Sequence, residues 1–456
     1  MLAVRNVVKV FGAGAERYVA LEGIDLGVSE GELVCLLGPS GCGKSTLLNI
    51  LAGFEQASAG TVEFDGAPVR GAGKDRVMFF QDAGSALLPW LSAEENVRFA
   101  LRVRKLLGGF GSDFRHSVRV DQYYPVFDAV RAYQLARHGE FGDYIPPSTS
   151  VLMERLFNAY SSISMSMLAV VPDKDYEIGK LYPKEVPVPI GSFFVPAITC
   201  NDFVFVAGQM ASDENALDAA VRLPSATRNW GGPNAVRRQT EFIIKKRLEP
   251  ALVAGGSSWA HALKAQIYVP SAADIPDALD VWRQHVGHPC AITAVPAKGF
   301  GFVDGIVEIN LLGLRDGAKR KKEVLKVDLP TTSAYGACVR AGELVFPSGL
   351  MPLGSDGHVV GKAQSAGFDG LAHASQSQAL AVFSNLEKIC HAAGTSLSNV
   401  VRAQYFMSDA RQFPGVELAW MSRQGRQPHP FVCVQVPGGL AAPGAVLTAD
   451  FWIYAP

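Results

Sequence analysis

Apolar positions along the C-terminal part of the chain follow two alternating periods. Residues Val400–Met407 and Ala445–Tyr454 are rich in β-branched and aromatic residues, which predicts strands. The segment Ser375–Ala393 instead places apolar residues at helical spacing, namely Leu380, Val382, Phe383, Leu386 and Ile389. This part of the chain therefore predicts strands that pack against long amphipathic helices.

The same pattern occurs earlier in the chain. The strand-like segment Asn201–Met210 resembles Gly342–Met351, with the same small-Gly turn and the same methionine. A second pair, Leu263–Val269 and Val401–Met407, is followed in each copy by a helical stretch that reaches a tryptophan, at Trp282 and Trp420. Such self-similarity indicates repeated structural units.

A third copy of the second segment lies at Val118–Pro125, and we take Gln122, Gln266 and Gln404 as the residues that mark the three units. Each complete unit predicts a hairpin-like start, a long helix, a strand, a second helix and two closing strands. Antiparallel strands with helices on one face give an α+β layer architecture.

The N-terminal part has a different pattern, in which an apolar segment, Glu32–Leu37, leads into GPSGCGKST and then into a helical run, Ser45–Leu51. Strand, loop and helix form the context of a Walker A phosphate-binding loop. The candidate nucleotide ligands in this loop are Gly38, Ser40, Gly41, Cys42, Gly43, Lys44, Ser45 and Thr46. Glycines let the backbone approach phosphates, Lys44 would meet the terminal phosphate and Ser45 would bind magnesium.

Around this loop, Val19–Gly66 resembles the ATP-binding subunit of an ABC importer, most closely the nitrate, sulfonate and taurine branch. The resemblance implies ATP and Mg²⁺ as cofactors and an ABC permease as a partner of a functional segment. It also implies that Phe11 stacks on adenine and that Gln81 senses the γ-phosphate and magnesium. Phe11 has an alternative interpretation as a core residue.

Beyond Leu106 this resemblance ends, and the sequence lacks the parts that hydrolyse ATP. It contains no LSGGQ-like signature, no four apolar residues ending in Asp-Glu, and no counterpart of the switch histidine. Phosphoryl transfer depends on positioning and electrostatic stabilisation by such groups. We therefore expect residues 1–106 to be a truncated α/β P-loop NTPase segment that can bind ATP without turnover.

The repeated units resemble the Rid (YjgF) family, most clearly at Ala334–Pro352 and Cys390–Asp409. The resemblance covers 187–314 and 329–456 as whole units and 111–172 as the second half of a unit. It implies an α+β, chorismate-mutase-like fold in tandem units, a trimer-like ring formed within one chain or between chains, and hydrolysis of reactive enamines and imines without a cofactor.

The site residues implied by this resemblance are only partly present. The family's carboxylate-binding arginine is matched by Ser148, by Ala291 or its neighbour, and by Phe431. Its acidic residue is matched by Glu308 in the middle unit and by Thr448 in the last.

Candidate substrate-pocket residues are Phe194, Tyr335 and Phe431, and Glu308 is the candidate catalytic residue. Because no arginine is present at the matched positions, the pockets are either retuned to a different, aromatic ligand or retained for structure. Glu308 has the alternative interpretation of a solvent-facing strand carboxylate.

Composition limits the remaining possibilities. The 456 residues carry a formal net charge of −1, so no broad attraction to nucleic acid is expected, and Lys319–Lys322 is interpreted as a solvated linker. Seven cysteines without a C-x-x-C pair, and no apolar run long enough to span a membrane, favour a cytoplasmic protein. No metal site is expected beyond magnesium held with ATP by Ser45 and Gln81.

Two hypotheses follow for the whole chain. The first is a Rid-like protein that binds or acts on small imine-type metabolites and carries a truncated ATP-binding segment. The alternative is an ABC transporter ATP-binding protein with a Rid-like C-terminal attachment. The sequence leaves open whether the fusion is natural or reflects a rearranged reading frame.

Overall fold

The protein divides into two compact units, Met1–Ala86 and Leu87–Pro456, which are described separately. The structure is a computed structural model. It describes residues 2–11, 18–29, 32, 34, 36, 43–71, 103–158, 161–174, 176–188, 193–213, 216–222, 234–300, 305–330, 338–361 and 370–456.

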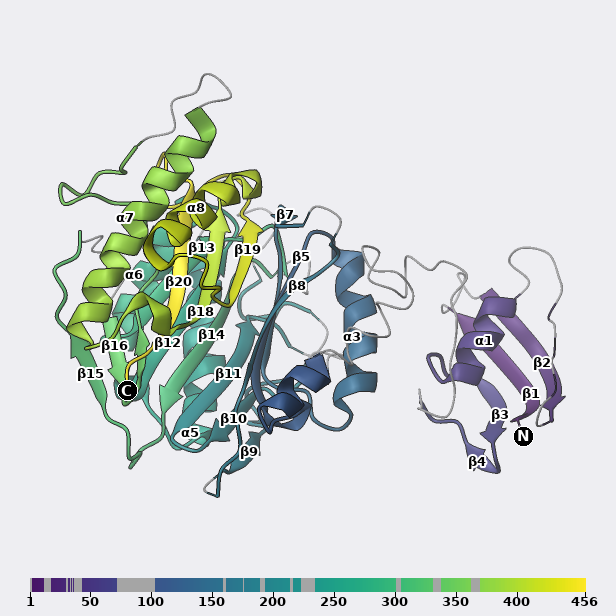
Figure 1. The fold of residues 1–456 in the computed structure, drawn as a ribbon. Helices are drawn as coiled ribbons and strands as arrows, with labels where there is room; N and C mark the ends of the chain where they lie inside the picture. Colours follow the sequence, from purple (N-terminus) through teal and green to yellow (C-terminus); the bar gives the residue numbers. More distant parts are fainter. Residues whose placement is uncertain are drawn as a thin grey trace. The chain divides into compact units, whose positions relative to one another are not determined.

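The described residues of the N-terminal unit form an antiparallel sheet and one helix (Figure 1). The sheet has the order β2-β1-β3-β4, from strands β1 (Leu2–Phe11), β2 (Tyr18–Val28), β3 (Ala59–Phe64) and β4 (Ala67–Pro68). Helix α1 (Lys44–Ala52) buries Leu47 and Ile50 against this sheet, in a cluster with Val4, Val7, Leu21 and Val62. This small core holds the end of the phosphate-binding loop against β2.

The expectation of a strand over Glu32–Leu37 is wrong where it can be assessed. Glu32, Val34 and Leu36 are described, and none of them is in a strand. A P-loop strand is paired with parallel neighbours, whereas the strands described in this unit pair with one another in antiparallel fashion. The predicted helix, by contrast, is present as α1.

The middle repeat of the larger unit forms a six-stranded sheet of order β13-β12-β14-β11-β10-β9. Its strands are β9 (Ile178–Leu181), β10 (Ala197–Cys200), β11 (Phe203–Met210), β12 (Ala262–Val269), β13 (Ala291–Pro296) and β14 (Glu308–Leu314). The helices are α4 (Ala235–Ile243), the π-helical turn η5 (Ile244–Leu248), α5 (Glu249–Ala254) and α6 (Ile275–Val286). They pack on one face of the sheet in a large apolar core.

The last repeat has the same arrangement in a seven-stranded sheet of order β15-β16-β17-β20-β18-β19-β7. Its strands are β15 (Lys322–Leu325), β16 (Cys338–Ala341), β17 (Leu344–Phe346), β18 (Val400–Met407), β19 (Phe431–Gln435) and β20 (Leu447–Tyr454). Helices α7 (Gly370–Ala392) and α8 (Phe413–Gln424) cover it. The strands and the long helix predicted from the sequence are thus confirmed.

A shorter repeat precedes these two. It consists of β5 (Ser117–Tyr124), α3 (Phe127–Phe141), β6 (Ser148–Leu152) and β8 (Ser164–Ala169), with the sheet order β6-β5-β8. Strand β7 (Arg155–Leu156) leaves this sheet and pairs with β19 of the last repeat. Short 3-10 turns stand before the central strands or the second helices, namely η3 (Phe114–His116), η6 (Trp259–His261), η7 (Ala272–Asp274), η8 (Leu397–Asn399) and η9 (Ala410–Gln412).

The three repeats share one irregularity that fixes their alignment. Strands β5, β12 and β18 each shift register against their closing strand just before Arg119, Lys264 and Arg402. Two residues further on stand Asp121, Gln266 and Gln404. The alignment of Gln122 with Gln266 and Gln404 is therefore wrong by one residue, because sequence similarity alone did not show where the bulge lies.

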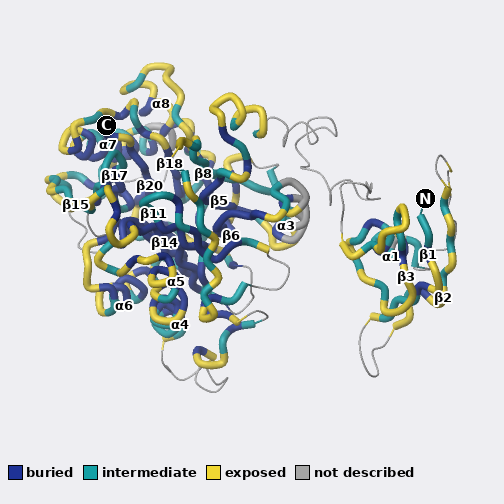
Figure 2. The backbone as a smooth tube through the Cα atoms, turned by 90° about the horizontal axis from the view of Figure 1, so that it is seen from below, coloured by how far each residue is buried: buried dark blue, intermediate teal, exposed yellow. Residues whose placement is uncertain are grey.

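The three sheets meet through the faces that their own helices leave uncovered. Tyr123, Tyr268 and Phe406 occupy equivalent positions on β5, β12 and β18 and pack into one buried cluster. Figure 2 shows the strands of the larger unit as mostly buried and its helices as partly exposed. One chain thus brings three homologous sheets around a common centre.

Candidate functional site

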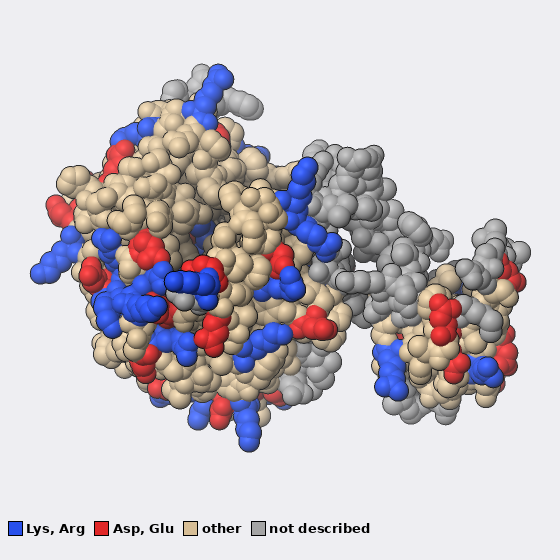
Figure 3. Space-filling view, turned by 60° about the horizontal axis from the view of Figure 1, so that its bottom comes forward, with Lys and Arg blue, Asp and Glu red and all other residues tan. Residues whose placement is uncertain are grey.

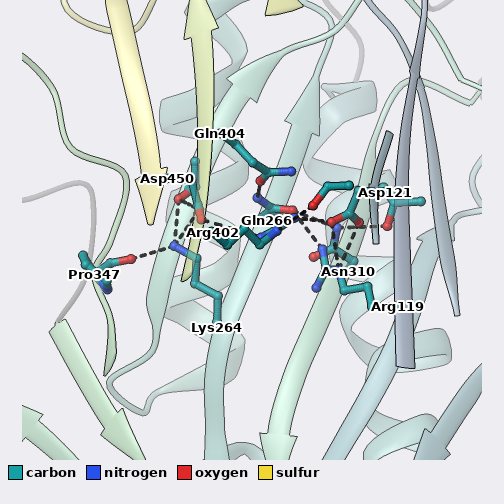
Figure 4. A network of polar contacts seen from close by, with 12 residues as sticks. Arg119, Asp121, Lys264, Gln266, Asn310, Pro347, Arg402, Gln404 and Asp450 are labelled. Atoms are coloured by element: carbon teal, nitrogen blue, oxygen red, sulfur yellow. Dashed lines mark hydrogen bonds and ion pairs between the residues drawn. The ribbon is translucent and has the colours of Figure 1, made fainter. Parts of the chain in front are cut away.

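A buried polar network runs through the centre where the three sheets meet (Figure 4). Arg119 donates through Nε to Asp121 Oδ1 at 3.0 Å, and Arg402 donates to the same carboxylate. Arg119 also donates through Nη2 to Gln266 Oε1 at 2.9 Å. One acid of the short repeat therefore compensates the buried charge of an arginine from the last repeat.

Amides and phenols continue this network between repeats. Gln266 Nε2 donates to Gln404 Oε1 at 2.5 Å, and Gln404 Nε2 donates to the Tyr123 hydroxyl at 2.8 Å. The hydroxyls of Tyr123 and Tyr268 lie 3.0 Å apart. Every repeat is thus hydrogen-bonded to the other two.

Lys264 is the cation of the middle repeat in this network. Its Nζ lies 2.7 Å from Asp450 Oδ2 and donates to Thr293 Oγ1 at 2.9 Å and to Pro347 O at 2.6 Å. Burial lowers the pKa of Lys264, and the Asp450 carboxylate opposes that shift. Because these charges are enclosed and paired, the network joins the repeats and leaves no open ligand site among them.

Glu308 stands at the start of β14 and is 4% exposed. The Ser150 N–H of strand β6 donates to Glu308 Oε1 at 3.4 Å. Burial raises the pKa of Glu308 to about 8, with a further rise from Asp121 that the Ser150 hydrogen bond opposes. The interpretation of Glu308 as a solvent-facing carboxylate is wrong, and a carboxyl of this pKa can both give and take a proton near neutral pH.

The backbone of β11 makes room for this carboxyl group. A Cβ atom at Gly208 would lie 1.9 Å from Glu308 Oε1, so only glycine fits there without displacing the side chain. Gly208 belongs to the segment Asn201–Met210 that recurs in the last repeat. The small-Gly turn noticed in the sequence thus shapes the surroundings of Glu308.

Polar side chains of the short repeat form hydrogen bonds with one another beside β6. Ser150 Oγ donates to Gln122 Oε1 at 2.8 Å, and the Tyr124 hydroxyl donates to the same oxygen at 3.3 Å. Arg137 of α3 donates through Nη1 to Ser148 Oγ at 3.0 Å. The candidate site is therefore built by two repeats, with Glu308 from one and strand β6 from the other.

The equivalent positions in the other repeats carry different chemistry. By strand register, Glu308 corresponds to Ser164 and Thr448, which face Tyr123 and Phe406 as Glu308 faces Tyr268. Of the three positions, only Glu308 supplies an acid. The three contacts between repeats are thus unequal.

By the same register, the residues equivalent to one another are Ser148, Ile292 and Phe431, which pair with Val120, Ala265 and Ala403. In the middle repeat this position is Ile292, the neighbour of Ala291.

Two of the three predicted pocket residues, Phe431 and Phe194, are described. Phe431 is 37% exposed and stacks on Phe413 with ring centroids 4.8 Å apart, in β19 of the last repeat. Phe194 is half-buried, ahead of β10. Tyr335 lies outside the described residues.

Part of the phosphate-binding loop is described. Gly43 has φ +91°, and a Cβ there would lie 2.4 Å from Ala20 O. Lys44 and Thr46 follow in the first turn of α1, where backbone N–H groups favour anions. Phe11 ends β1 with 39% of its surface exposed and with Lys9 Nζ 4.8 Å from its ring centroid, so it is not a core residue. Gly38, Ser40, Gly41, Cys42, Gln81 and the Ser45 side chain lie outside the described residues.

The basic stretch Lys319–Lys322 is held by the fold. Arg320 Nη1 lies 3.1 Å from Asp202 Oδ2, and its guanidinium also pairs with Glu343. Lys322 Nζ donates to Ala260 O at 2.9 Å. Figure 3 shows basic and acidic side chains interspersed on the larger unit.

None of the helices described is long and apolar enough to cross a membrane. Within the same residues, no group of three or more His, Cys, Asp or Glu side chains is placed to hold a metal ion.

Comparison with known families accounts for most of the chain. The model described as endoribonuclease L-PSP matches residues 184–314 and 326–444, together more than half of the 456 residues. The chain belongs to the endoribonuclease L-PSP family. This is the Rid family that the sequence resembles, and both matches fall on the complete repeats of the structure.

Solved structures similar to this chain include other L-PSP or Rid proteins, each matched over nearly all of its own length. RidA from Psychrobacter is 24% identical and covers 29% of this chain and 98% of its own, with a TM-score of 0.23. Yeast Mmf1 is 20% identical over 30% of this chain and 100% of its own, with a TM-score of 0.24.

The N-terminal part matches a second family, described as ABC transporter, over residues 21–137. A taurine import ATP-binding protein of Burkholderia pseudomallei is 47% identical over 25% of this chain and 42% of its own length. A nitrate import ATP-binding protein of Synechococcus elongatus is 44% identical over 21% and 35%. The chain therefore joins an ABC ATP-binding segment, spanning about two fifths of the length of such relatives, to the L-PSP repeats.

Two buried polar residues of the short repeat were missed by sequence reasoning. Asp121 was overlooked because Gln122 was aligned with Gln266 and Gln404 in its place. Arg137 follows the end of β5 at the same distance in sequence as Trp282 follows β12 and Trp420 follows β18. The recurring tryptophan could therefore have identified this position in the sequence.

Proposed function

We propose that the L-PSP repeats hydrolyse small imines at Glu308, in a site completed by β6 of the short repeat. The observation that carries this proposal is the buried Glu308 carboxyl, with its pKa raised to about 8 and its contact with the Ser150 N–H. General acid–base catalysis is most effective when the pKa of the catalytic group is close to the working pH.

The reaction uses the two protonation states of Glu308 in turn. The neutral carboxyl donates its proton to the imine nitrogen, and the resulting carboxylate accepts a proton from the water that attacks the imine carbon. The carbon–nitrogen bond then breaks, so one imine and one water give one carbonyl compound and one ammonia. No redox step or cofactor is needed.

Ammonia release from freshly generated 2-aminoacrylate tests this proposal. Removing a general acid–base costs about 10²- to 10⁴-fold in rate, so Glu308→Gln should lose at least about 10²-fold. Thr448→Ala, at the equivalent position of the last repeat, should leave the rate unchanged. Equal ammonia release by Glu308→Gln and the unaltered protein would refute the role of Glu308.

We further propose that the N-terminal segment binds ATP with Mg²⁺ and does not turn it over. The placement of Gly43 and Lys44 at the start of α1, together with the match to importer ATP-binding proteins, supports binding. The absence of a signature, a Walker B motif and a switch histidine argues against hydrolysis. An ABC permease is the partner that this part would take if it works as its relatives do.

Titration calorimetry of ATP and magnesium against the full chain, with an assay of phosphate release, distinguishes ATP binding without turnover from ATP hydrolysis. We expect measurable binding that Lys44→Ala abolishes, and no phosphate release in a parallel assay. Phosphate release that depends on Lys44 would instead favour the second candidate function, an ABC transporter ATP-binding protein with an L-PSP attachment.

We also propose 1–106, 111–172, 187–314 and 329–456 as the limits of the ATP-binding segment, the partial repeat and the two complete repeats. The β-α-β-β arrangement of β5, α3, β6 and β8 supports the partial repeat. The hydrogen bonds that join all three repeats in the network support a trimer-like ring formed within one chain.

A further inference from the structure

We infer that the outer edge of strand β8 is a docking site for an extended, uncharged segment of another protein, which pairs with β8 as an antiparallel strand. This inference does not rest on the proposed function, because it concerns neither Glu308 nor the ATP-binding segment. It adds an interaction surface and the kind of partner that fits it.

The complete repeats show what covers the equivalent edge. Strand β8 corresponds by register to β14 and β20, since Tyr123 faces Ser164 as Tyr268 faces Glu308. On the side away from the central strand, β14 pairs with β11 and β20 pairs with β17, in both cases antiparallel. The sheet of the short repeat ends at β8, and no described strand pairs with its outer edge. An antiparallel strand is therefore the element that the other repeats place at this edge.

The exposure of β8 agrees with this difference in pairing. All six residues of β8 are half-buried, whereas β14 is buried throughout and β20 is buried except at Tyr454. The closing strands that are paired on both edges are thus enclosed, and the one paired on a single edge retains accessible surface.

The backbone of β8 presents hydrogen-bonding groups at its outer edge. The Val170 N–H donates to His116 O at 2.9 Å, on the side of β5. Because the backbone groups of successive residues point to opposite sides of a strand, the N–H and C=O groups of Ala169 and Met167 point away from β5. Their register equivalents in β14 face valines of β11. An added strand can pair with these groups in the same way.

Other edge strands of the larger unit are covered or carry charged side chains. Strand β13 lies against the last repeat, where the Ile292 N–H donates to Ser348 Oγ at 3.0 Å. Strands β9 and β15 end their sheets and expose Lys180 and Glu323. Proteins protect edge strands in these ways, because an uncovered and uncharged edge pairs readily with another strand. The sequence of β8, Ser-Met-Ser-Met-Leu-Ala, contains neither a charged residue nor a proline, so it favours pairing.

The side chains of β8 select the chemistry of the partner. Met165 and Met167 correspond to Ile309 and Leu311, which are buried in the core beneath the helices of the middle repeat. Methionine is flexible and packs against apolar side chains of different shapes. A charged side chain on the added strand would lie beside these methionines without an opposite charge from β8. An uncharged, apolar strand such as Phe203–Met210 therefore fits this edge.

A peptide with the sequence of Phe203–Met210, the strand that pairs with β14, is the probe. It is capped at both ends, carries a fluorescent label and is titrated with the full chain while its anisotropy is recorded. We expect saturable binding. A matched peptide with proline in place of Val204 and Val206 should bind at least about tenfold more weakly, because proline lacks the N–H that an added strand donates. This comparison uses the unaltered protein, so it does not depend on how substitutions affect the fold.

Two variants of the chain test the edge itself. Ala169→Pro removes an N–H that points away from β5, and Met167→Lys adds a charge to the strand. Each should weaken binding of the Phe203–Met210 peptide at least about tenfold. Val324→Lys makes the same change in charge at an exposed position of the edge strand β15 and should leave the affinity unchanged. Thermal melting verifies that each variant is folded.

Two results would overturn the inference. The first is an absence of saturable binding, or equal peptide affinity in the unaltered protein and both β8 variants. The second is a dimer of the unaltered chain in sedimentation that Met167→Lys dissociates, because the edge would then bind a second copy of the same chain.

Discussion

At the scale of single residues, Asp121 has a particular role in joining the three sheets of the larger unit. Asp121 stands where the other repeats have Gln266 and Gln404, and it accepts hydrogen bonds from Arg119 and Arg402. Without its charge, two buried guanidinium groups would lie in a medium that solvates them poorly. The short repeat therefore contributes to the larger unit through its electrostatics as well as its packing.

Replacing Asp121 by Asn should lower the free energy of unfolding of the larger unit by about 3–5 kcal/mol, because it leaves buried charges uncompensated. Urea unfolding monitored by tryptophan fluorescence measures the effect. Asp409→Asn removes an acid that pairs with the exposed Arg411 and should cost about 1 kcal/mol or less. Similar losses in the two variants would show that the network contributes no more than a surface pair.

Glu308 makes the free energy of unfolding of the larger unit depend on pH. Its pKa in the folded protein is about 8, against a usual value of 4.5, so the folded state holds a proton that the unfolded chain releases. This contribution to stability is fully present below about pH 4.5 and is lost as the pH rises through 8. Each pKa unit corresponds to about 1.4 kcal/mol.

Glu308→Gln keeps the shape of the side chain and removes the proton. We expect its melting temperature to exceed that of the unaltered protein at pH 8.5 and the difference to shrink or reverse at pH 5. Glu323→Gln, at an exposed position of β15, controls for the change in net charge. A difference that does not vary between these pH values would contradict a raised pKa.

At the scale of elements, the start of α1 depends on one backbone conformation. Gly43 has φ +91°, and the space beside its Cα is filled by Ala20 O and the Leu21 side chain. Helix α1 packs on the sheet through Leu47 and Ile50, so the loop end and the small core are held together. Any other residue at Gly43 must be strained and must also displace its neighbours.

Gly43→Ala should destabilise the N-terminal unit by about 1–3 kcal/mol, the usual cost of a strained backbone conformation. Hydrogen exchange should quicken in β1, β3 and α1 and stay unchanged in β12 and β18. Gly27→Ala, in β2, meets no atom within 4 Å and should leave exchange unaltered. Exchange rates in β1, β3 and α1 that do not differ between the Gly43 variant and the unaltered protein would mean that the contact between strand and helix tolerates a side chain at this position.

Helices and strands were predicted best where apolar residues recur at a regular spacing over many residues. Helix α7 and strand β18 follow the spacing of their apolar residues, because each buries one face in its own repeat. The register of β5 was not predictable in the same way. A bulge shifts which side chains face the centre, and similarity between neighbouring glutamines cannot locate it.

At the scale of the whole molecule, contacts between distant segments join three repeats of one chain. Arg402 pairs with Asp121, Gln266 with Gln404, and β7 with β19. The equivalent positions differ in each repeat, so the three contacts between repeats are not interchangeable. One chain can therefore carry an acid at one of these contacts and uncharged residues at the equivalent positions of the other two.

We therefore expect the full chain to sediment with the mass of one chain at micromolar concentration. Association through the repeats would need surfaces that these contacts already bury. A Gln404→Ala variant should remain monomeric and lose stability, since its amide hydrogen-bonds with Gln266 and Tyr123 of the same chain. Sedimentation of the unaltered protein as a homotrimer of chains would show that the ring forms between chains.

The sequence by itself determined the family of each part and the order of strands and helices in the complete repeats, because these depend on local periodicity and on motifs. It also singled out Glu308 as a candidate catalytic acid. Only the tertiary structure decided that Glu308 is buried against β6, that Asp121 rather than Gln122 belongs to the centre, and that Arg137 lies beside Ser148. Burial of Glu308 between repeats also raises the pKa of its carboxyl group. Those properties arise only when segments distant in the chain pack together.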